Sequence, residues 1–335
     1  MSFIEQALTL RNVVIRNRVF LAPMSGVSDL PFRRRAAEAG AGMVVSEMVA
    51  SAELCNRHRE SMLRLSGDGL GLHVVQLAGR EARWMAEAAR IAAGEGADII
   101  DINMGCPAKK VTGGYSGSAL MRDLDHAMTL IEATVNAVDV PVTLKMRLGW
   151  DENSINAPEL AARAENAGVA MVTVHGRTRN QFYEGKADWD AIRAVRDAVK
   201  IPLVANGDVA SRADAEEILR RSGADAVMVG RASYGQPWLA GLIAGADHAP
   251  RTNLEKLDYI IRHYEDMLNH YGSRTGIRHA RKHLGWYLDC HASALCGPAD
   301  KAHVMTLVDP AAVIAALQDI FRRDPADREA YRKVA

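Results

Sequence analysis

Short runs of β-branched and other apolar residues recur along the first 230 residues of the chain. The runs span residues 19–24, 43–48, 72–77, 98–104, 141–147, 171–175, 202–206 and 225–230. Their starts lie roughly 23 to 43 residues apart, the length of a strand–helix–strand unit. The segments between them, such as 81–93, 157–167 and 212–221, have helical spacing, and several end at a glycine. The pattern predicts eight strands that alternate with helices.

Eight such units favour a closed (β/α)8 TIM barrel over an open doubly wound sheet. No Gly-x-Gly-x-x-Gly sequence opens the first strand–helix turn, which weakens the interpretation as a dinucleotide-binding fold. The short alternating run at 8–15 is predicted to form a hairpin that seals the bottom of the barrel.

The strand pattern stops after about residue 240. Residues 253–334 carry apolar positions at three- and four-residue spacing, and Asp309-Pro310 marks a predicted helix start. The fold class is therefore α/β, a TIM barrel followed by a small all-α C-terminal domain. We place the barrel at residues 1–245 and the helical domain at 246–335.

Composition adds limits on function. The chain has 335 residues, of which 48% are hydrophobic and 24% charged, and its formal net charge is +0. Any site for nucleic acid must therefore be a local patch. The four cysteines (Cys55, Cys106, Cys290 and Cys296) have neither disulfide-framework nor cluster-binding spacing, so we expect free thiols, no bound metal and a cytoplasmic protein. No apolar segment is long enough to span a membrane, and no signal peptide is expected.

The chemistry-bearing residues fall at the ends of the predicted strands. These ends read Ala22-Pro23-Met24-Ser25, Ser46-Glu47-Met48, Gln76, Asn103 to Cys106, Lys145-Met146-Arg147, His175-Gly176-Arg177, Asn206-Gly207-Asp208 and Gly230-Arg231. In a barrel, the carboxyl ends of the strands meet at one face, where active sites lie. The sequence therefore predicts a single site at this face.

Part of that site is suited to a flavin mononucleotide (FMN). Asn206-Gly207-Asp208 and Gly230-Arg231 follow strands seven and eight, where barrels commonly bind phosphate. Gln76 can recognise an imide edge because an amide both donates and accepts, and Lys145 can hold negative charge on a reduced ring. His175 is predicted to point inward beside them. Each residue alone is more often structural, but together they indicate FMN.

One cysteine stands out at the end of the fourth strand. Cys106 lies in a Gly-Cys-Pro sequence, directly after the strand and before a basic pair that begins with Lys109. An isolated cysteine is more often a packed core residue. The strand end, the glycine-rich loop that follows and the lysines favour a functional thiol.

These segments resemble the tRNA-dihydrouridine synthases, and among them the bacterial B-type branch. The most specific match is Asp101-Ile102-Asn103-Met104-Gly105-Cys106-Pro107-Ala108-Lys109-Lys110-Val111, and the other strand ends match in order along the barrel. The resemblance implies an FMN-dependent enzyme that uses NADPH or NADH to reduce the C5=C6 bond of a uridine in tRNA. Cys106 would donate the proton, and Asn103, Lys109 and Arg177 would lie on the substrate side.

The resemblance also implies roles for the remaining strand-end residues. Pro23, Met24 and Ser25 would line the flavin ring, and Gln76 would read its pyrimidine edge. Lys145 and His175 would hold the ring and ribityl region. The phosphate would be held by Asn206, Gly207, Asp208, Gly230 and Arg231.

The helical tail offers the local basic patch that the neutral chain otherwise lacks. Arg274, Arg278, Arg281 and Lys282 can share one helical face, with Trp286 and Tyr287 close by. Such a face is often only solvated, but cations can bind phosphates and aromatic rings can stack on unpaired bases. We expect this face to bind tRNA, and we expect the protein to act as a monomer.

Two other interpretations remain open. A dihydroorotate- or dihydropyrimidine-type FMN dehydrogenase would share the barrel and the strand-end cysteine but would act on a free pyrimidine. The basic tail and the missing iron–sulfur cysteines weigh against it. A non-catalytic RNA-binding regulator could retain the barrel, although the complete set of strand-end residues weighs against that as well.

Overall fold

A computed structural model describes residues 2–324, and the predicted helical residues beyond 324 lie outside this range. The barrel sheet has the strand order β4-β3-β11-β10-β9-β8-β7-β6-β5, and all of its pairings are parallel. The strands are β3 (Val19–Leu21), β4 (Met43–Val44), β5 (Val49–Ala50), β6 (Val74–Ala78), β7 (Ile99–Met104), β8 (Val142–Arg147), β9 (Met171–His175), β10 (Leu203–Asn206) and β11 (Ala226–Val229).

The predicted eight-stranded barrel is confirmed, with one interruption. Strand β4 lies within the second predicted strand, at 43–48, whereas β5 begins directly after its end, and residues 45–48 leave the regular ladder between the two. A parallel bridge from Val45 to Val74 and the parallel pairing of β5 with β6 join this segment to the next strand and close the ring.

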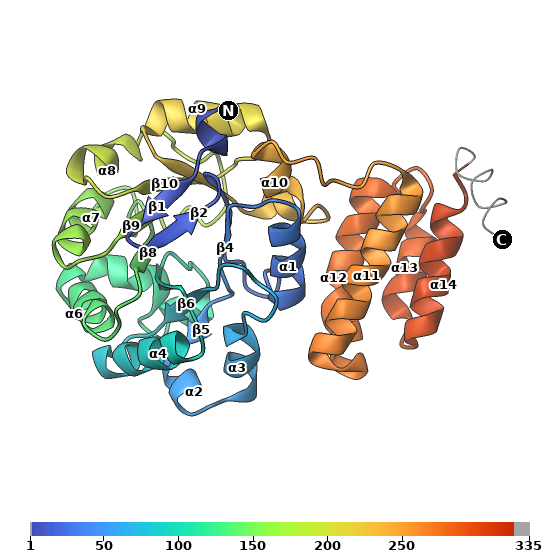
Figure 1. The fold of residues 1–335 in the computed structure, drawn as a ribbon, viewed down its shortest axis with the longest axis horizontal. Coiled ribbons are helices and arrows are strands. Elements are labelled where there is room, and N and C mark those ends of the chain that lie inside the picture. Colours follow the sequence, from blue (N-terminus) through green and yellow to red (C-terminus); the bar gives the residue numbers. More distant parts are fainter. Residues whose placement is uncertain (1, 325–335) are drawn as a thin grey trace.

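Helices surround the ring of strands (Figure 1). They are α1 (Leu30–Glu38), α2 (Ser51–Cys55), α3 (Arg59–Leu65), α4 (Ala82–Gly94), α5 (Lys109–Thr112), α6 (Leu124–Val135), α7 (Ala157–Asn166), α8 (Arg193–Ala198), α9 (Arg212–Ser222) and α10 (Leu239–Ile243). Three short 3-10 turns, η1 (Phe3–Glu5), η2 (Gly117–Arg122) and η3 (Arg231–Ser233), complete this part of the chain.

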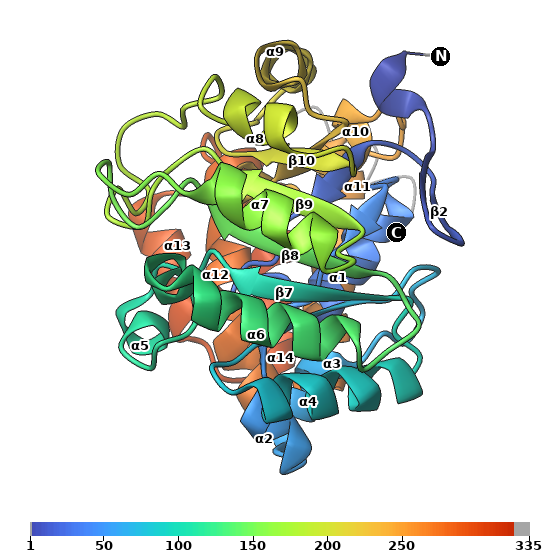
Figure 2. The ribbon, with the colours of Figure 1, turned by 90° about the vertical axis from the view of Figure 1, so that its left-hand side faces the viewer.

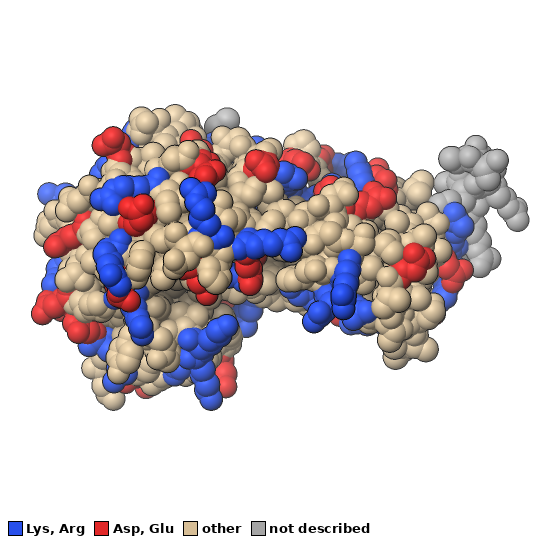
Figure 3. Space-filling model, turned by 90° about the horizontal axis from the view of Figure 1, so that it is seen from below, with Lys and Arg blue, Asp and Glu red and all other residues tan. Residues whose placement is uncertain are grey.

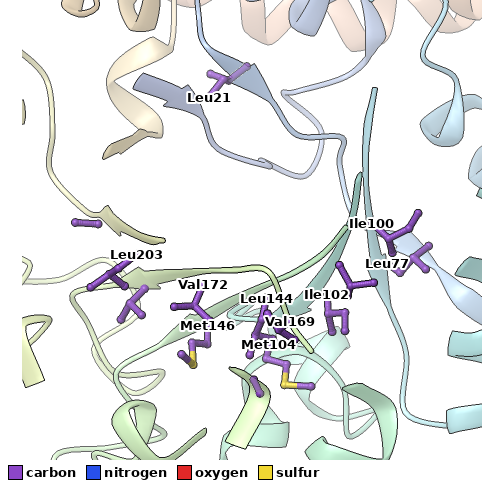
Figure 4. Close-up of a cluster of buried hydrophobic side chains, with 14 of the residues drawn as sticks. Leu21, Leu77, Ile100, Ile102, Met104, Leu144, Met146, Val169, Val172 and Leu203 are labelled. Carbon is purple, nitrogen blue, oxygen red and sulfur yellow. The ribbon is translucent and has the colours of Figure 1, made fainter. Parts of the chain in front are cut away.

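The outward-facing strand residues pack against these helices in one core. Leu77, Ile102, Leu144 and Val172 belong to it, and Figure 4 shows several of these side chains along neighbouring strands. Burial of a side chain of this size is worth about 1.5–3 kcal/mol. This packing makes the barrel a rigid support for the polar residues that point inward.

The lower end of the barrel is filled with apolar side chains and covered by a hairpin. Strands β1 (Leu8–Leu10) and β2 (Val13–Ile15) pair antiparallel, as predicted. Leu10 and Ile15 belong to the same buried cluster as Phe20, Ile99 and Met171. Figure 2 shows the hairpin at one end of the barrel and α5 at the other, so the polar strand ends open only on the side of α5.

The tail, as far as residue 324, forms four helices beside the barrel: α11 (Asn253–Tyr271), α12 (Ser273–His291), α13 (Pro298–Thr306) and α14 (Pro310–Phe321). Asp309 caps α14 by accepting the backbone N–H of Ala312 at 3.0 Å, which confirms the predicted helix start. The tail has its own apolar core, which also includes Trp238 from the end of the barrel. Tyr271 donates to Asp29 of the barrel at 3.1 Å, so the helices are docked rather than tethered.

Candidate active site at the carboxyl ends of the strands

A cavity of about 880 Å³ opens at the carboxyl ends of the barrel strands. It brings together Cys106, Asn103 and the whole predicted set of cofactor-binding residues, namely Pro23, Met24, Ser25, Gln76, Lys145, His175, Asn206, Gly207, Asp208, Gly230 and Arg231. Its volume lies within the range typical of sites for small molecules and cofactors.

Strand alternation explains why these side chains meet. Successive residues of a strand point to opposite faces, so every second residue of β7 and β8 enters the barrel. Asp101 and Asn103 point inward from β7, and Lys145 follows from β8, where it pairs in register with Asn103. The residues between them, such as Ile102 and Leu144, are in the outer core.

A buried chain of hydrogen bonds fixes the amide groups of the cavity. Thr143 Oγ1 donates to Asp101 Oδ1 at 2.6 Å, and Gln76 Nε2 donates to Asp101 Oδ2 at 2.7 Å. Asn103 Nδ2 donates in turn to Gln76 Oε1 at 2.7 Å. Because an ionised carboxylate only accepts, Asp101 holds the NH2 group of Gln76 on its own side. The orientation of both amides therefore depends on one buried carboxyl group.

Cys106 is held at the cavity wall by its backbone. Its N–H donates to Asn103 Oδ1 at 3.0 Å, and its carbonyl accepts from Ser118 Oγ at 2.8 Å. Gly117 makes the tight return possible, since it has a φ of +61° and an added Cβ would lie 2.9 Å from the Cys106 carbonyl oxygen. The thiol is therefore the part of Cys106 left free for chemistry.

The environment keeps that thiol protonated at neutral pH. Burial raises the pKa of Cys106, while the backbone N–H of Ala108 and the charges of Arg147 and Lys145 offset this only in part. A protonated thiol is a proton donor rather than a nucleophile.

The ends of β10 and β11 present unsatisfied backbone donors to the cavity. Gly207, Asp208, Val209 and Gly230 all line it. Among the described residues, none accepts a hydrogen bond from any of these four N–H groups. Backbone donors left without partners are rare in folded proteins unless a ligand or water satisfies them. The Arg231 side chain lies beside them, 3.6 Å from Asp208, so the group is suited to an anion.

The side chain of Lys145 makes the inner part of the cavity positive, which also suits an anion. Burial lowers the pKa of Lys145 to about 8, which still leaves it largely protonated at neutral pH. Lys145 Nζ donates to Asn206 Oδ1 at 3.1 Å. Burial also lowers the pKa of His175 well below its ordinary value, and the neighbouring cations add to this effect. His175 is therefore a neutral hydrogen-bonding group beside a positive lysine.

Two residues predicted on the substrate side do not line the cavity. Arg177 is 1% exposed and donates to Asp208 Oδ2 at 2.6 Å and to the Gly185 carbonyl at 2.7 Å. It stands behind the wall and orients Asp208. Lys109 is exposed at the start of α5, three residues beyond Cys106.

The cationic face of α12 divides into two parts. Arg274 and Arg278 are exposed, and no described residue gives either guanidinium a hydrogen bond or ion pair. Arg281 is half-buried and donates to the Leu307 carbonyl at 3.3 Å, while Lys282 Nζ reaches Gly26 of the barrel. Figure 3 shows basic side chains on both lobes, bordering the hollow between barrel and tail.

The aromatic residues of α12 are packed inside the protein. Tyr287 is 1% exposed and its hydroxyl lies 2.9 Å from His263 Nδ1. The expectation that Tyr287 stacks on RNA bases is therefore wrong, because its ring belongs to the core of the tail. Trp286 is half-buried and stacks on Tyr234 at 4.1 Å between ring centroids.

The structure gives roles in the site to three residues for which the sequence predicted none. Asp101 orients Gln76, as described above. Arg147 is buried and donates from Nε to the Gly105 carbonyl at 2.9 Å, so it supports the Cys106 loop. Tyr183 lines the cavity beneath the guanidinium of Arg231, at 4.5 Å from its ring centroid. The inward register of β7 and β8 could have identified the first two, whereas no local signal marks Tyr183.

Residues 20–312 match the family model described as dihydrouridine synthase. The chain belongs to the dihydrouridine synthase family. It is 66% identical to a probable tRNA-dihydrouridine synthase of Rhizobium leguminosarum over 90% of this chain and 95% of the relative. It is also 45% identical to tRNA-dihydrouridine synthase B of Xanthomonas campestris, over 92% and 93% of the two chains. The family resemblance, the B-type affinity and the assignment as an enzyme are thus confirmed.

Solved structures outside the family share the barrel. Histamine dehydrogenase from Rhizobium sp. 4-9 aligns with a TM-score of 0.53 at 14% identity, covering 79% of this chain and 51% of that one. A structure of TcOYE with pHBA aligns with a TM-score of 0.55 at 14% identity, covering 74% of this chain and 95% of that one. At this identity the matches support the fold class alone.

Within residues 2–324, no three His, Cys, Asp or Glu side chains converge as a metal site. None of the helices in the described part of the chain is long and apolar enough to cross a membrane.

Proposed function

We propose that this member of the dihydrouridine synthase family reduces the C5=C6 bond of a uridine in tRNA to give 5,6-dihydrouridine, with FMN as cofactor and NADPH or NADH as electron donor. The names of the relatives at 45–66% identity support the substrate. The observation that carries the cofactor assignment is the group of unsatisfied N–H donors at the ends of β10 and β11.

The residues of the cavity fit FMN. The backbone N–H groups of Gly207, Asp208 and Gly230, with the Arg231 guanidinium, would hold the phosphate, as the ends of strands seven and eight do in other barrels. Gln76, oriented by Asp101, would meet the donors and acceptors of the pyrimidine edge of the ring. Lys145 would lie against the ring, with His175 toward the ribityl chain and Pro23, Met24 and Ser25 along the side.

FMN, when bound, would supply the hydride for C6 of the base, with NAD(P)H as the source of its electrons. The Cys106 thiol donates its proton to C5, so two electrons and two hydrogens are added in all. Lys145 would stabilise negative charge on the reduced flavin ring, and Asn103 would orient the base while it holds the Cys106 loop. The Cys106 thiolate is reprotonated from solvent.

The tail would supply the affinity for tRNA. Arg274 and Arg278 project from α12 without carboxylate partners among the described residues, as counter-charges for phosphates require. Lys109 would contact the substrate strand at the rim near Cys106. We further propose that the protein acts as a monomer in the cytoplasm, which size-exclusion chromatography and cell fractionation test directly.

Reconstitution tests this function. Purified protein loaded with FMN is incubated with unmodified tRNA and either NADPH or NADH, and dihydrouridine is mapped in the product. We expect dihydrouridine at defined positions in tRNA and no turnover of free uridine, uracil or orotate. Turnover of a free pyrimidine without tRNA reduction would favour the dehydrogenase alternative. FMN-loaded protein that reduces neither substrate would contradict the proposal.

A further inference from the structure

Helix α12 packs directly on the loop that follows β11. This loop, residues 230–236, carries Arg231 and Tyr234, both of which line the cavity. The ring of Trp286 stacks on the ring of Tyr234 at 4.1 Å and an interplanar angle of 15°. A stacked aromatic pair is worth about 0.5–1.5 kcal/mol beyond the area that it buries. One residue of the tail therefore covers the back of a cavity wall.

Two hydrogen bonds fix the same contact. His291 Nε2 donates to the Gly235 carbonyl at 2.7 Å, and Cys290 Sγ donates to the Tyr234 carbonyl at 3.6 Å. The backbones also approach closely, because Gly235 has a φ of +71° and an added Cβ would lie 2.7 Å from the Trp286 carbonyl oxygen. The loop position is thus set by α12 and not by the barrel alone.

The same helix reaches the neighbouring loop of the cavity. Strands β3 and β11 pair side by side, so the loops that follow them are adjacent. Lys282 Nζ lies 3.2 Å from the place of a Cβ on Gly26, next to Ser25 of the cavity wall. Residues 278, 282, 286 and 290 follow one another at four-residue spacing, which places them along one side of the helix.

Arg231 has little else to hold it. Its side chain is 46% exposed, its distance to Asp208 is 3.6 Å, and its other close contact is the ring of Tyr183 at 4.5 Å. The position of its guanidinium therefore depends on the backbone of the loop, and the loop is supported by the Tyr234–Trp286 stack.

We propose that Trp286 is a positioning residue for the cofactor phosphate: through Tyr234 it holds the loop of Arg231, so the helical tail is a structural part of the FMN site. This inference rests on the proposed use of FMN. It follows that α12, which carries the exposed cations Arg274 and Arg278, also supports a wall of the cofactor cavity. Removal of the Tyr234–Trp286 stack should then weaken binding of the phosphate of FMN and leave binding of the rest of the flavin unchanged.

Flavin titrations of the full-length apoprotein separate this role from a general structural one. Dissociation constants for FMN and for riboflavin, which lacks the phosphate, are measured by fluorescence for wild type, Trp286→Ala, Trp286→Phe and Arg231→Ala. We expect Trp286→Ala to weaken FMN binding about tenfold, which is less than the loss expected when a charge-assisted hydrogen bond is removed completely. Riboflavin binding should change less than twofold. Trp286→Phe, which retains a stacking ring, should stay close to wild type.

Two further variants keep the test decisive. His291→Ala removes the bond to Gly235 and should reproduce the FMN-selective loss, even if Trp286→Ala fails to fold. Trp84→Ala, which removes a half-buried tryptophan from α4, should alter neither affinity. In a double-mutant cycle, Trp286→Ala with Arg231→Ala should cost less than the product of the two single effects, because both act on one phosphate contact.

The outcomes distinguish this inference from the function on which it rests. Equal losses for FMN and riboflavin in Trp286→Ala and His291→Ala, or no loss for either flavin, would overturn the positioning role while the function stands. A wild-type protein that prefers FMN to riboflavin supports the phosphate site. A wild-type protein that binds neither flavin would overturn both proposals.

Discussion

The side chain of Asn103 holds the backbone of Cys106. Asn103 Oδ1 accepts the Cys106 N–H at 3.0 Å, while Asn103 Nδ2 donates to Gln76 Oε1 at 2.7 Å. One amide thus connects the loop of the thiol to the side chain proposed to read the flavin. A change in the orientation of Gln76 would therefore move Asn103 and with it the loop that carries the proton donor. Flavin binding and proton transfer are thus connected through Asn103.

Replacement of Cys106 should separate the two half-reactions. Cys106→Ala removes the proton donor and should lower the rate of uridine reduction about 10²–10⁴-fold, the usual effect of losing a general acid. Reduction of bound FMN by NAD(P)H needs no thiol and should keep its rate. Stopped-flow absorbance follows the flavin, and dihydrouridine formation reports the second step.

Cys55→Ala is the matched control, because Cys55 is a half-buried thiol on α2 that does not line the cavity. It should leave both steps unchanged. Dihydrouridine formation by Cys106→Ala at the wild-type rate would remove Cys106 from the mechanism.

The buried carboxyl group of Asp101 should matter for orientation more than for stability. Burial raises the pKa of Asp101, so its charge is unfavourable in the folded state, and Asp101→Asn relieves that cost. An amide at this position can donate, and it then no longer dictates the direction of the Gln76 amide. We expect FMN affinity to fall about tenfold, the effect of roughly one hydrogen bond, with little change in melting temperature.

Asp98→Asn provides the comparison at the opposite end of the barrel. Asp98 Oδ2 accepts the His73 N–H at 2.7 Å, just before β7 and away from the cavity. This variant should change FMN affinity less than twofold. Unchanged FMN binding in Asp101→Asn would show that the orientation of Gln76 does not depend on the carboxyl group.

His283 should make the protein sensitive to mild acid. It is 1% exposed, neither ring nitrogen has a hydrogen-bond partner among residues 2–324, and burial lowers its pKa well below the ordinary value of about 6.5. Below that pH the unfolded chain takes up a proton that the folded chain does not bind. The free energy of unfolding therefore falls as pH drops below about 6.5, by up to about 1.4 kcal/mol per pH unit for each such group.

His283→Phe removes the titrating ring and leaves a ring of similar size among Phe32, His263 and Trp286. We expect urea denaturation to give equal or higher stability at pH 7 and a shallower decline between pH 6.5 and 5. His263 should contribute in the same direction, since burial lowers its pKa to about 3. A variant as acid-sensitive as wild type would mean that His283 does not titrate in this window.

Strand alternation explains why so much of the site could be predicted. His175 and Asn206 are the last residues of β9 and β10, and Lys145 lies two residues before the end of β8. All three have inward register, so the pattern of apolar residues alone brings them to one face. Strand alternation does not predict the position of Arg177, because its side chain turns away and donates to carbonyl groups of the loop at 184–185. Such hydrogen bonds depend on loop paths that no periodicity describes.

The tail shows a different source of error. Tyr287 stands near four cations in the sequence, which suggests an exposed ring. By helical spacing, Tyr287 lies on the same face of α12 as the buried residues Ala280, Leu284 and Leu288, and that face packs on the core of the tail. The helical period would have placed Tyr287 correctly, whereas the stack of Trp286 on Tyr234 joins segments 52 residues apart and has no local signal.

The last prediction concerns the cations of α12. The chain has no net charge, so attraction to RNA must come from a local cluster. Arg274 and Arg278 are exposed and lie one helical turn apart, whereas Arg281 is engaged with the Leu307 carbonyl and Lys282 with the barrel. The double variant Arg274→Ala/Arg278→Ala should therefore weaken tRNA binding and reduce its salt dependence, by about 0.7–0.9 in the log–log slope for each phosphate that is no longer neutralised.

The control removes the same charge from the same region. Arg251 and Arg262 are ion-paired with Asp247 and Asp258, so their guanidinium charges are already compensated. Arg251→Ala/Arg262→Ala should leave affinity and salt slope close to wild type, and FMN content should be normal in both double variants. Because phosphate contacts are independent of sequence, Arg274→Ala/Arg278→Ala should weaken binding to every tRNA by a similar factor. Equal salt slopes for this variant and wild type would mean that α12 presents only a solvated face and that the RNA binds elsewhere.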